Sequence, residues 1–459
     1  MNRFGIEIDV KNKPLLDPEF MPIGLFNKAY LKNAKKPVSL AVERSNGQMA
    51  TIHTYIHGTE EMAQADAYYV DRLIKQILWM KGGFRVYVSG DEAMYNNLKS
   101  AYTEEGSRAF DATFMAGVYE HPFEVVWCDK VPEENGTSQA IGRHLGGCRI
   151  GFDAGGSDRK VSAVIDGEPV FSEEVVWFPK INSDPDYHYE GIVSALKTAA
   201  GKMPRVDAVG VSSAGIYIDN CTMVASLFLK VPKDLFNAKV KDIYIRAVRD
   251  TFGPDVPLIV ANDGDVSALA GAMGLGENEV LGIAMGTSEA VGFVDEKGNI
   301  TGWLNELAFM PLDANPDAME DEWSDDIGCG VKYFSQDSVI KLAPRAGIEL
   351  DPDLSPAEKL KMVQNLMAED DARATSVYAS IGTYLGHTLA YYYELYRCKH
   401  VLLLGRVMSG KGGDLILSEA KRVLAEEYPE CDGKLFPALP DEKSRRVGQS
   451  VAAASLPEV

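Results

Sequence analysis

The sequence has few cysteines, no long apolar run and no apolar leader. Six cysteines in 459 residues, none of them in a C-x-x-C pair, are too few for a disulfide-stabilised scaffold. Reduced thiols in this number are typical of a cytosolic enzyme, so we expect a cytoplasmic protein. No apolar run approaches the ~18 residues that a membrane-spanning helix needs. The first residues, MNRFGIEIDVKNK, lack the hydrophobic segment of a signal peptide, and none is expected.

Positive charge is also scarce. The chain carries 46 Lys and Arg against 67 Asp and Glu, which gives a formal net charge of −21. An average field of this sign repels phosphate, which argues against nucleic acid or an anionic membrane as the main partner. A small anionic ligand in a local site remains compatible with it.

The remaining composition is that of a globular protein. Hydrophobic residues make up 46% and charged residues 25%, which excludes a mostly disordered chain. At about 150 residues per domain, the length suggests roughly three structural units.

Residues 36–130 have the pattern of a small α/β unit. Two alternating segments flank Asn46-Gly47, a dipeptide that favours tight turns, and so predict a β-hairpin. A helix with one apolar face and further alternating strands follow. A polar, turn-rich segment at 132–139 is the expected linker. From Cys148 onward strands and helices alternate, which indicates an α/β fold.

Four motifs lie at expected strand ends in the second part. The first is Asp153-Ala-Gly155-Gly156-Ser157-Asp-Arg-Lys160. Glycines let a backbone approach a phosphate, and amide and hydroxyl groups can donate to it. A strand-end aspartate can hold Mg²⁺ through water. A glycine-rich β-turn of no chemical significance is the alternative interpretation.

The second motif is Gly286-Thr287-Ser288, again between two expected strands. It offers the same chemistry, a glycine turn with hydroxyl and amide donors. An ordinary hairpin turn is the alternative.

The third motif is Asn262-Asp263-Gly264-Asp265, at the end of an apolar run and before a segment of small residues. A carboxylate at the carboxyl end of a strand can accept a hydroxyl proton or bind a metal. A helix N-cap is the alternative, and it explains one of the two carboxylates.

The fourth motif, LGRVMSGKGGD, includes Gly405, Ser409, Gly410 and Gly413 and joins a strand to a helix. A flat surface of glycine and serine suits stacking against a nucleotide base. Ordinary strand-to-helix turns have similar sequences.

The order of these motifs resembles that of the actin-like ATPase superfamily, which includes sugar kinases and hexokinases. Within it the chain is most similar to the ROK family of bacterial sugar kinases and sugar-responsive proteins, over about residues 148–459. The matching segments are, in chain order, DAGGSDRK, GVSSAGIYI, VANDGDVSALAGA, GCGVKYFSQDSVIKLA, GRVMSGKGG and RRVGQSVAAA.

The resemblance implies a two-lobed, ribonuclease H-like fold, preceded by an additional small N-terminal α/β domain of unknown role. The additional domain would be 1–145, the small lobe 148–270 plus 443–459, and the large lobe 271–442. In such proteins two hairpins bind the phosphates of ATP, and the last glycine-rich turn contacts adenosine.

The resemblance also implies roles for single residues. Asp263 would be the general base for the attacking hydroxyl, and Asp153 would organise Mg²⁺. The phosphates would contact Gly155, Gly156, Ser157, Lys160, Gly286, Thr287 and Ser288. Adenosine would contact Gly405, Ser409, Gly410 and Gly413. The acceptor would contact Ser213, Gly215, Ser226, Asn262, Asp265 and Glu306.

The chain departs from the family pattern on the acceptor side. Glu306 matches the family's sugar-binding Glu, but Ala308-Phe309 stand where a Gly-His pair is expected. Ser226 replaces a sugar-contacting Asn, and Asp265 replaces the second Asn of an Asn-Asp-x-Asn pattern. The sugar site is therefore degenerate.

The family's zinc cluster, Cys-x-Cys-Gly-x-x-Gly-Cys, is degenerate as well. Only Cys329 remains of it, and Val331 stands where a second acidic ligand follows. Because structural zinc needs four ligands, we expect none.

The sequence therefore predicts an ATP- and Mg²⁺-dependent kinase that acts on a hydroxyl of a sugar or sugar-like substrate. The alternatives are a non-catalytic sugar or nucleotide sensor of the same fold, and an ATPase that does not phosphorylate a sugar. The expected partner is a small sugar or polyol, without nucleic acid or membrane, and a homodimer is compatible with it. The N-terminal segment is not basic and shows no helix-turn-helix spacing, so a DNA-binding repressor is not expected.

Overall fold

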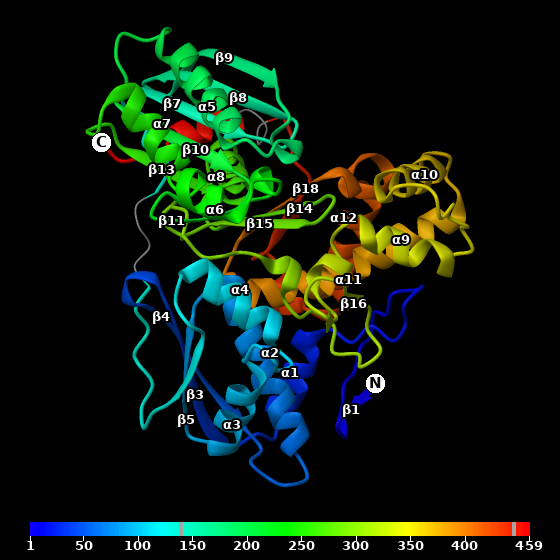
Figure 1. The fold of residues 1–459 in the computed structure, drawn as a ribbon. Coiled ribbons are helices and arrows are strands. Elements are labelled where there is room, and N and C mark those ends of the chain that lie inside the picture. The colour runs from blue at the N-terminus through cyan, green and yellow to red at the C-terminus, as the bar shows by residue number, and fades with distance from the viewer. Residues whose placement is uncertain (137–140, 443–446) are drawn as a thin grey trace. The chain divides into compact units, whose positions relative to one another are not determined.

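The computed structural model describes residues 1–136, 141–442 and 447–459. The chain divides into two compact units, each assembled from segments that are distant in sequence (Figure 1). Unit 1 comprises Met1–Thr137, Ile283–Val291 and Trp303–Leu439, and unit 2 comprises Ser138–Gly282, Gly292–Gly302 and Pro440–Val459. The expected linker at 132–139 and the start of the small-lobe segment at 443 lie partly outside the described residues. The division into one extra domain and two lobes stays a prediction.

A four-stranded sheet in the order β4-β3-β5-β6 forms the N-terminal part of unit 1. β3 (Lys36–Arg44) pairs antiparallel with β4 (Gln48–Ile56) and β5 (Arg85–Ser89), and β5 pairs parallel with β6 (Glu124–Trp127). The hairpin predicted around Asn46 is confirmed. The helices of this part are α2 (Ala63–Lys81), α3 (Glu92–Ala101) and α4 (Ala109–Tyr119).

A second four-stranded sheet, in the order β15-β14-β18-β19, carries the Gly286 hairpin. Its strands are β14 (Val280–Met285), β15 (Glu289–Val294), β18 (His400–Leu404) and β19 (Phe436–Ala438). The larger helices that accompany it in unit 1 are α9 (Gln336–Arg345), α10 (Pro356–Ala368), α11 (Ala372–Tyr396) and α12 (Gly410–Glu427). The long helix α11 packs along α12.

The N-terminal arm of unit 1 contains two short strands, β1 (Asn2–Arg3) and β2 (Ile6–Glu7), and the helix α1 (Ile23–Leu31). Two further short strands, β16 (Glu320–Asp321) and β17 (Asp326–Ile327), pair in the segment that precedes Cys329. The carboxylate of Asp326 forms ion pairs with Arg72 at 2.8 Å and Lys75 at 2.7 Å, both on α2. The β16–β17 segment is therefore fixed to the N-terminal part of unit 1.

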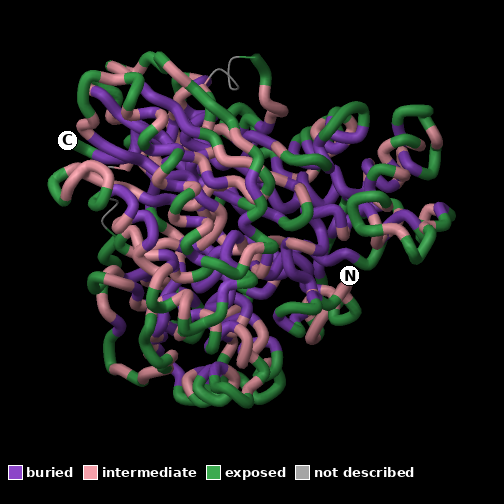
Figure 2. The backbone as a smooth tube through the Cα atoms, turned by 45° about the horizontal axis from the view of Figure 1, so that its top comes forward, coloured by how far each residue is buried: buried purple, intermediate pink, exposed green. Residues whose placement is uncertain are grey.

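Unit 2 is built on a five-stranded sheet in the order β13-β10-β7-β8-β9. Its strands are β7 (Cys148–Ala154), β8 (Asp158–Ile165), β9 (Glu168–Val176), β10 (Ala208–Ser213) and β13 (Leu258–Asn262). β7, β10 and β13 are parallel, so their carboxyl ends meet at one edge. β7 and β10 are almost wholly buried, as their apolar runs predict. Figure 2 shows the buried parts of the backbone in purple.

The helices of unit 2 include α5 (Pro185–Ala200), α7 (Ile243–Phe252), α8 (Asp263–Leu275) and α13 (Gln449–Ala454). α13 lies so close to β7 and β10 that only glycine fits beneath it. A Cβ on Gly151 would be 1.6 Å from the carbonyl oxygen of Ser450, and one on Gly210 would be 1.7 Å from that of Ala453. This close packing places Gln449, the first residue of α13, near the carboxyl edge of the sheet.

The mixed sheets and helices confirm the α/β fold class. None of the described helices is both long enough and apolar enough to cross a membrane.

Candidate active site

Two aspartates meet at the carboxyl edge of the unit 2 sheet. Asp153 lies near the end of β7, and Asp263 follows β13 directly and begins α8. Burial raises the pKa of Asp153 to about 6, and the negative charge of Asp263 adds to this increase. Burial also raises the pKa of Asp263. The pair therefore has the proximity and the proton affinity that acid–base work requires.

A polar network connects the Asp153 carboxylate to the backbone of Asp263. The Ser212 hydroxyl of β10 donates to Oδ1 of Asp153 at 2.9 Å. Nε2 of Gln449 donates to the Ser212 oxygen at 2.8 Å and to the carbonyl oxygen of Asp263 at 3.1 Å. Ser212 and Gln449 lie within the GVSSAGIYI and RRVGQSVAAA segments, but the resemblance implies no role for either residue. The parallel register, which places Ser212 beside Asp153, is the signal that a correct sheet topology would have supplied.

Asn262 and Asp265 both make backbone contacts. Asn262 is the N-cap of α8: its Oδ1 accepts from the Gly264 amide at 2.7 Å, and its Nδ2 donates to the Gly215 carbonyl at 2.8 Å. Asp265 is 5% exposed, and its Oδ1 accepts from the Phe293 amide at 3.2 Å. Acceptor contacts by these two residues stay a prediction.

Ser213 and Ser226 belong to the expected acceptor set in unit 2. The Ser213 oxygen is buried and accepts from the hydroxyls of Tyr217 at 2.7 Å and Tyr244 at 2.9 Å. Ser226 is half-buried and begins a short 3₁₀ turn. Ser213 lies at the end of β10, opposite Asn262 of β13.

The first glycine turn joins β7 to β8. Ser157 is exposed at its tip. Trp177 fixes the turn from one side: its Nε1 donates to the Gly155 carbonyl at 2.7 Å, and its amide donates to the Ser157 carbonyl at 3.1 Å. Lys160 lies on β8 and pairs with Glu174 of β9 at 3.4 Å.

The second glycine turn, in unit 1, lies against the fourth motif. Thr287 and Ser288 are exposed at its tip, and the Thr287 hydroxyl accepts from Nη2 of Arg406 at 2.8 Å. Gly405 has a φ of 92°, and a Cβ there would be 2.3 Å from the Met285 carbonyl oxygen. The structure thus brings together the expected phosphate and adenosine segments of this unit.

Ser409, Gly410 and Gly413 form the start of α12. Ser409 is the N-cap residue, and its side chain makes no capping hydrogen bond. Gly410 is exposed, whereas Gly413 is buried, and a Cβ on it would be 2.0 Å from the Met408 carbonyl oxygen. Close packing explains Gly413 without a ligand, whereas packing does not explain the exposed Ser409-Gly410 pair.

The segment that carries Glu306 packs against residues from the N-terminal part of the chain. The Glu306 amide donates to the Trp79 carbonyl at 2.9 Å, at the end of α2. The Phe309 ring lies 4.4 Å from that of Trp79 and 5.2 Å from that of Phe110 on α4. Half-buried Glu306 therefore depends for its position on residues outside the family resemblance, which no motif in the sequence indicates.

A second carboxyl lies beside Glu306. Glu289, the first residue of β15, is 4% exposed, and neither carboxyl oxygen has a hydrogen-bond partner within the described chain. Burial raises the pKa of Glu289 to about 8, and the charge of Glu306 adds to this increase. Glu289 is therefore protonated near neutral pH.

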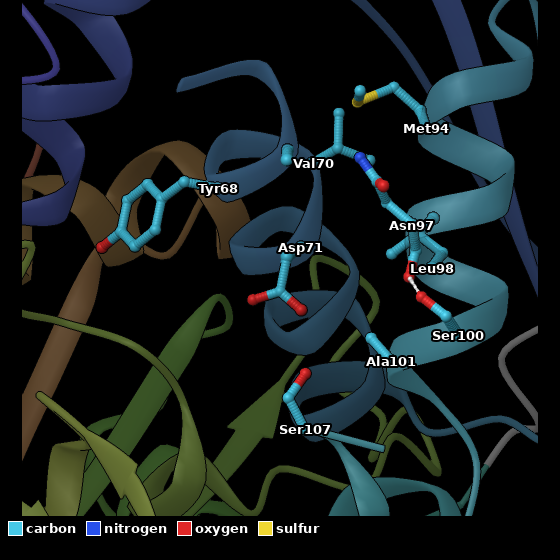
Figure 3. A pocket seen from close by; sticks show the side chains of 10 residues that line it. Tyr68, Val70, Asp71, Met94, Asn97, Leu98, Ser100, Ala101 and Ser107 are labelled. Carbon is cyan, nitrogen blue, oxygen red and sulfur yellow. Dashed lines mark hydrogen bonds between the residues drawn. The ribbon is translucent and has the colours of Figure 1, made fainter. Parts of the chain in front are cut away.

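Unit 1 also contains a hollow of about 420 Å³ between α2 and α3 (Figure 3). Asp71 lines it, but its carboxylate already accepts from Arg72 at 3.0 Å and Arg108 at 2.6 Å. None of the residues predicted from the motifs lines this hollow.

Cys329 is fully buried, and burial raises the pKa of its thiol to about 12. Within residues 1–136, 141–442 and 447–459, no group of three or more His, Cys, Asp or Glu side chains could hold a metal ion.

The sequence matches no protein-family model, and no curated protein matches it. Solved structures do match. A ROK hexokinase from Thermus thermophilus aligns with 67% of this chain and 97% of its own, at 17% identity and a TM-score of 0.50. The chain has the ROK fold. A ROK family transcriptional regulator, a homolog of the E. coli MLC protein, aligns with 68% of this chain and 79% of its own, at 16% identity and a TM-score of 0.50.

These matches confirm, at the level of the fold, the resemblance to ROK proteins that the motif order indicates. They include a kinase and a regulator at equal similarity, so the choice between catalysis and sensing depends on the chemistry of this chain's own residues.

Proposed function

We propose that the chain is a ROK-type kinase that transfers a phosphoryl group from ATP to a hydroxyl of a sugar or sugar-like substrate. The observation that carries this proposal is the meeting of Asp153 and Asp263 beside the Gly155–Ser157 turn, at the carboxyl edge of one sheet. Burial raises the pKa of the half-buried Asp263 carboxyl, which suits a group that accepts a proton from a hydroxyl.

Asp263 acts as the general base. Its raised pKa brings its proton affinity closer to neutral pH, where a carboxylate accepts a proton most effectively. The proton of the acceptor hydroxyl passes to the Asp263 carboxylate as the oxygen attacks the terminal phosphorus. Gln449 and Asn262 hold the backbone on either side of this carboxylate and so orient it.

The acidic edge also fits Mg²⁺. The charge of Asp263 raises the pKa of Asp153, and a cation beside Asp153 would relieve this repulsion. Mg²⁺ held there by Asp153 would supply charge neutralisation on the phosphates. The Ser212 hydroxyl holds Asp153 in a fixed orientation for this role.

The nucleotide is held by hydroxyl, amide and ammonium donors of the two glycine turns. Ser157 and Lys160 of the first turn, and Thr287 and Ser288 of the second, are the proposed phosphate ligands. The Gly405–Gly413 segment contacts adenosine, and the bond from Arg406 to Thr287 supports this grouping within unit 1. Catalysis of this kind depends mainly on positioning and electrostatic stabilisation.

The acceptor is a sugar, amino sugar or polyol other than plain glucose. Phe309 packs on Trp79 and cannot replace the hydrogen bonds of a histidine. Leaving a buried sugar hydroxyl unpaired costs about 1–3 kcal/mol. Glu306 remains as the expected hydroxyl ligand.

An ATP-consumption assay over a panel of sugars, amino sugars and polyols tests the proposal. We expect acceptor-dependent formation of ADP and of a phosphorylated product for at least one compound. Absence of acceptor-dependent turnover together with tight sugar binding would instead support a non-catalytic sensor of the same fold.

A further inference from the structure

A lysine that belongs to none of the motifs lies over the first glycine turn. Lys180 is in a short 3₁₀ turn, Pro179–Ile181, that follows β9. A Cβ on Gly156 would be 2.5 Å from Cε and 2.9 Å from Nζ of Lys180. The ammonium group of Lys180 therefore occupies the space directly above the backbone of Gly156.

The segment that carries Lys180 is fixed on two sides. Trp177 is 3% exposed and hydrogen-bonds to the carbonyls of Gly155 at 2.7 Å and Ser157 at 3.1 Å. On the other side, Nε2 of the buried His188, on α5, donates to the Pro179 carbonyl at 3.0 Å. The stem of Lys180 thus starts from a backbone whose position relative to the glycine turn is set by the fold.

The charge of Lys180 is available for a ligand. Its side chain is exposed, and within the described part of the chain it forms no ion pair. Its positive charge is close enough to Asp263 to lower the pKa of that carboxyl, against the increase caused by burial. Lys160, by contrast, already pairs with Glu174 at 3.4 Å.

Lys180 lies over the glycine turn, and its charge acts on Asp263, which has a definite chemical meaning if the proposed function holds. The phosphates of ATP lie on the turn, and the acceptor oxygen loses its proton to Asp263. The terminal phosphoryl group must therefore pass through the space between them. A cation in this space neutralises the charge that develops as the group is transferred.

We propose that Lys180 contacts the terminal phosphate of ATP and is a catalytic residue of this chain. A bond forms between the acceptor oxygen and the terminal phosphorus, and the bond from that phosphorus to the bridging oxygen of ADP breaks. The acceptor proton goes to Asp263. Lys180 keeps its protons throughout and contributes charge and hydrogen bonds alone. This inference rests on the proposed nucleotide site, and its phosphoryl-transfer part rests on the proposed function.

The variant Lys180→Met tests it, because methionine keeps most of the aliphatic stem over Gly156 but removes the charge. Lys180→Arg restores a cation, and Lys197→Met is the matched control, an exposed lysine on α5 that belongs to none of the motifs. Each full-length protein is titrated with Mg-ATP and with Mg-ADP by calorimetry, and kcat is measured with the acceptor found in the panel.

We expect Lys180→Met to bind Mg-ATP about tenfold more weakly, a change of about 1.4 kcal/mol, while Mg-ADP affinity is unchanged. We also expect kcat to fall about 10²- to 10³-fold, as when one charge-stabilising donor is removed. Lys180→Arg should recover part of both, and Lys197→Met should match the wild type.

Two results would overturn the inference, because a purely structural role of the lysine would produce them. One is an equal loss of affinity for Mg-ATP and Mg-ADP. The other is a fall in kcat while the preference for Mg-ATP over Mg-ADP is unchanged. An unchanged variant overturns it as well. If the wild type transfers phosphate to no acceptor, yet its preference for Mg-ATP over Mg-ADP depends on Lys180, the contact to the terminal phosphate stands and the proposed kinase function fails.

Discussion

The carboxyl group of Glu289 and the hydroxyl of Tyr392 are buried beside one another in unit 1, each close enough to change the pKa of the other. Neither forms a hydrogen bond of ordinary geometry with any described residue. A buried carboxyl without partners is stable only in its neutral form. Near neutral pH, Glu289 is therefore expected to hold its proton in the folded protein.

This arrangement makes the stability of the protein depend on pH. The pKa of Glu289 is about 8 in the folded protein against an ordinary value of 4.5, so between these values only the folded state holds the proton. The free energy of unfolding should then fall as pH rises, by about 1.4 kcal/mol per pH unit, and this contribution should be constant above pH about 8. Glu289→Gln has no proton to lose.

Melting temperatures of wild type and Glu289→Gln, measured from pH 5 to pH 8, check this expectation. The variant should gain stability relative to the wild type as pH rises. A difference that stays constant across this range would show that Glu289 ionises normally in the folded protein.

The sequence predicts the α/β pattern from Cys148 onward well because the signals for it are local in the chain. The strand-end motifs of Asp153 and Asp263 combine glycine turns with apolar runs, and the parallel register then brings their carboxylates together. The hairpin around Asn46 follows from a two-residue turn signal of the same local kind.

Contacts between distant segments are what sequence reasoning misses. Gln449 reaches the acidic edge because α13 packs on two glycines of the sheet, almost 300 residues from Gly151 by position in the printed chain. Lys180 reaches Gly156 through the bonds of Trp177, which has no motif of its own. The N-terminal arm has little apolar periodicity, yet α1 forms there because Phe26 and Tyr30 are buried by tertiary packing.

The aromatic contact of Phe309 should stabilise the Glu306 segment. Phe309→Ala removes the rings' contacts with Trp79 and Phe110, and because Phe309 is half-buried we expect a loss of about 1–3 kcal/mol, less than for a fully buried phenylalanine. Acceptor KM should rise while the affinity for Mg-ATP stays unchanged. Phe436→Ala, at a position that is 49% exposed, is the control and should cost less than about 0.5 kcal/mol. An unchanged acceptor KM in Phe309→Ala would separate this ring from the acceptor site.

We expect nucleotide binding to require glycine at position 405 for two reasons. Its backbone lies close to that of Met285, and its φ is positive. Gly405→Ala would place a Cβ 2.3 Å from the Met285 carbonyl oxygen at a φ of 92°, which displaces the turn from the Thr287 hairpin. Gly433→Ala is the matched control, because Gly433 has a φ of 65° with no atom within 4 Å of the added Cβ. The control should lose roughly 1–2 kcal/mol of stability from the backbone alone. Only Gly405→Ala should also weaken Mg-ATP binding in calorimetry, and equal ATP affinity in both variants would contradict this role.

The purified, untagged protein should contain no stoichiometric zinc. Cys329 is the one cysteine left of the family's cluster, and structural zinc needs four ligands. Elemental analysis by mass spectrometry checks this. One zinc per chain would show that ligands other than the family's cluster bind it.

The most direct test of the central claim is phosphoryl transfer by Asp263→Asn. Asparagine keeps the size of the side chain and removes the proton acceptor, so the turnover rate on the acceptor found in the panel should fall about 10²- to 10⁴-fold. Calorimetric affinity for Mg-ATP should remain that of the wild type, because Asp153 and the glycine turns are unchanged. Wild-type turnover in this variant would contradict the account, since another group would then take the acceptor proton.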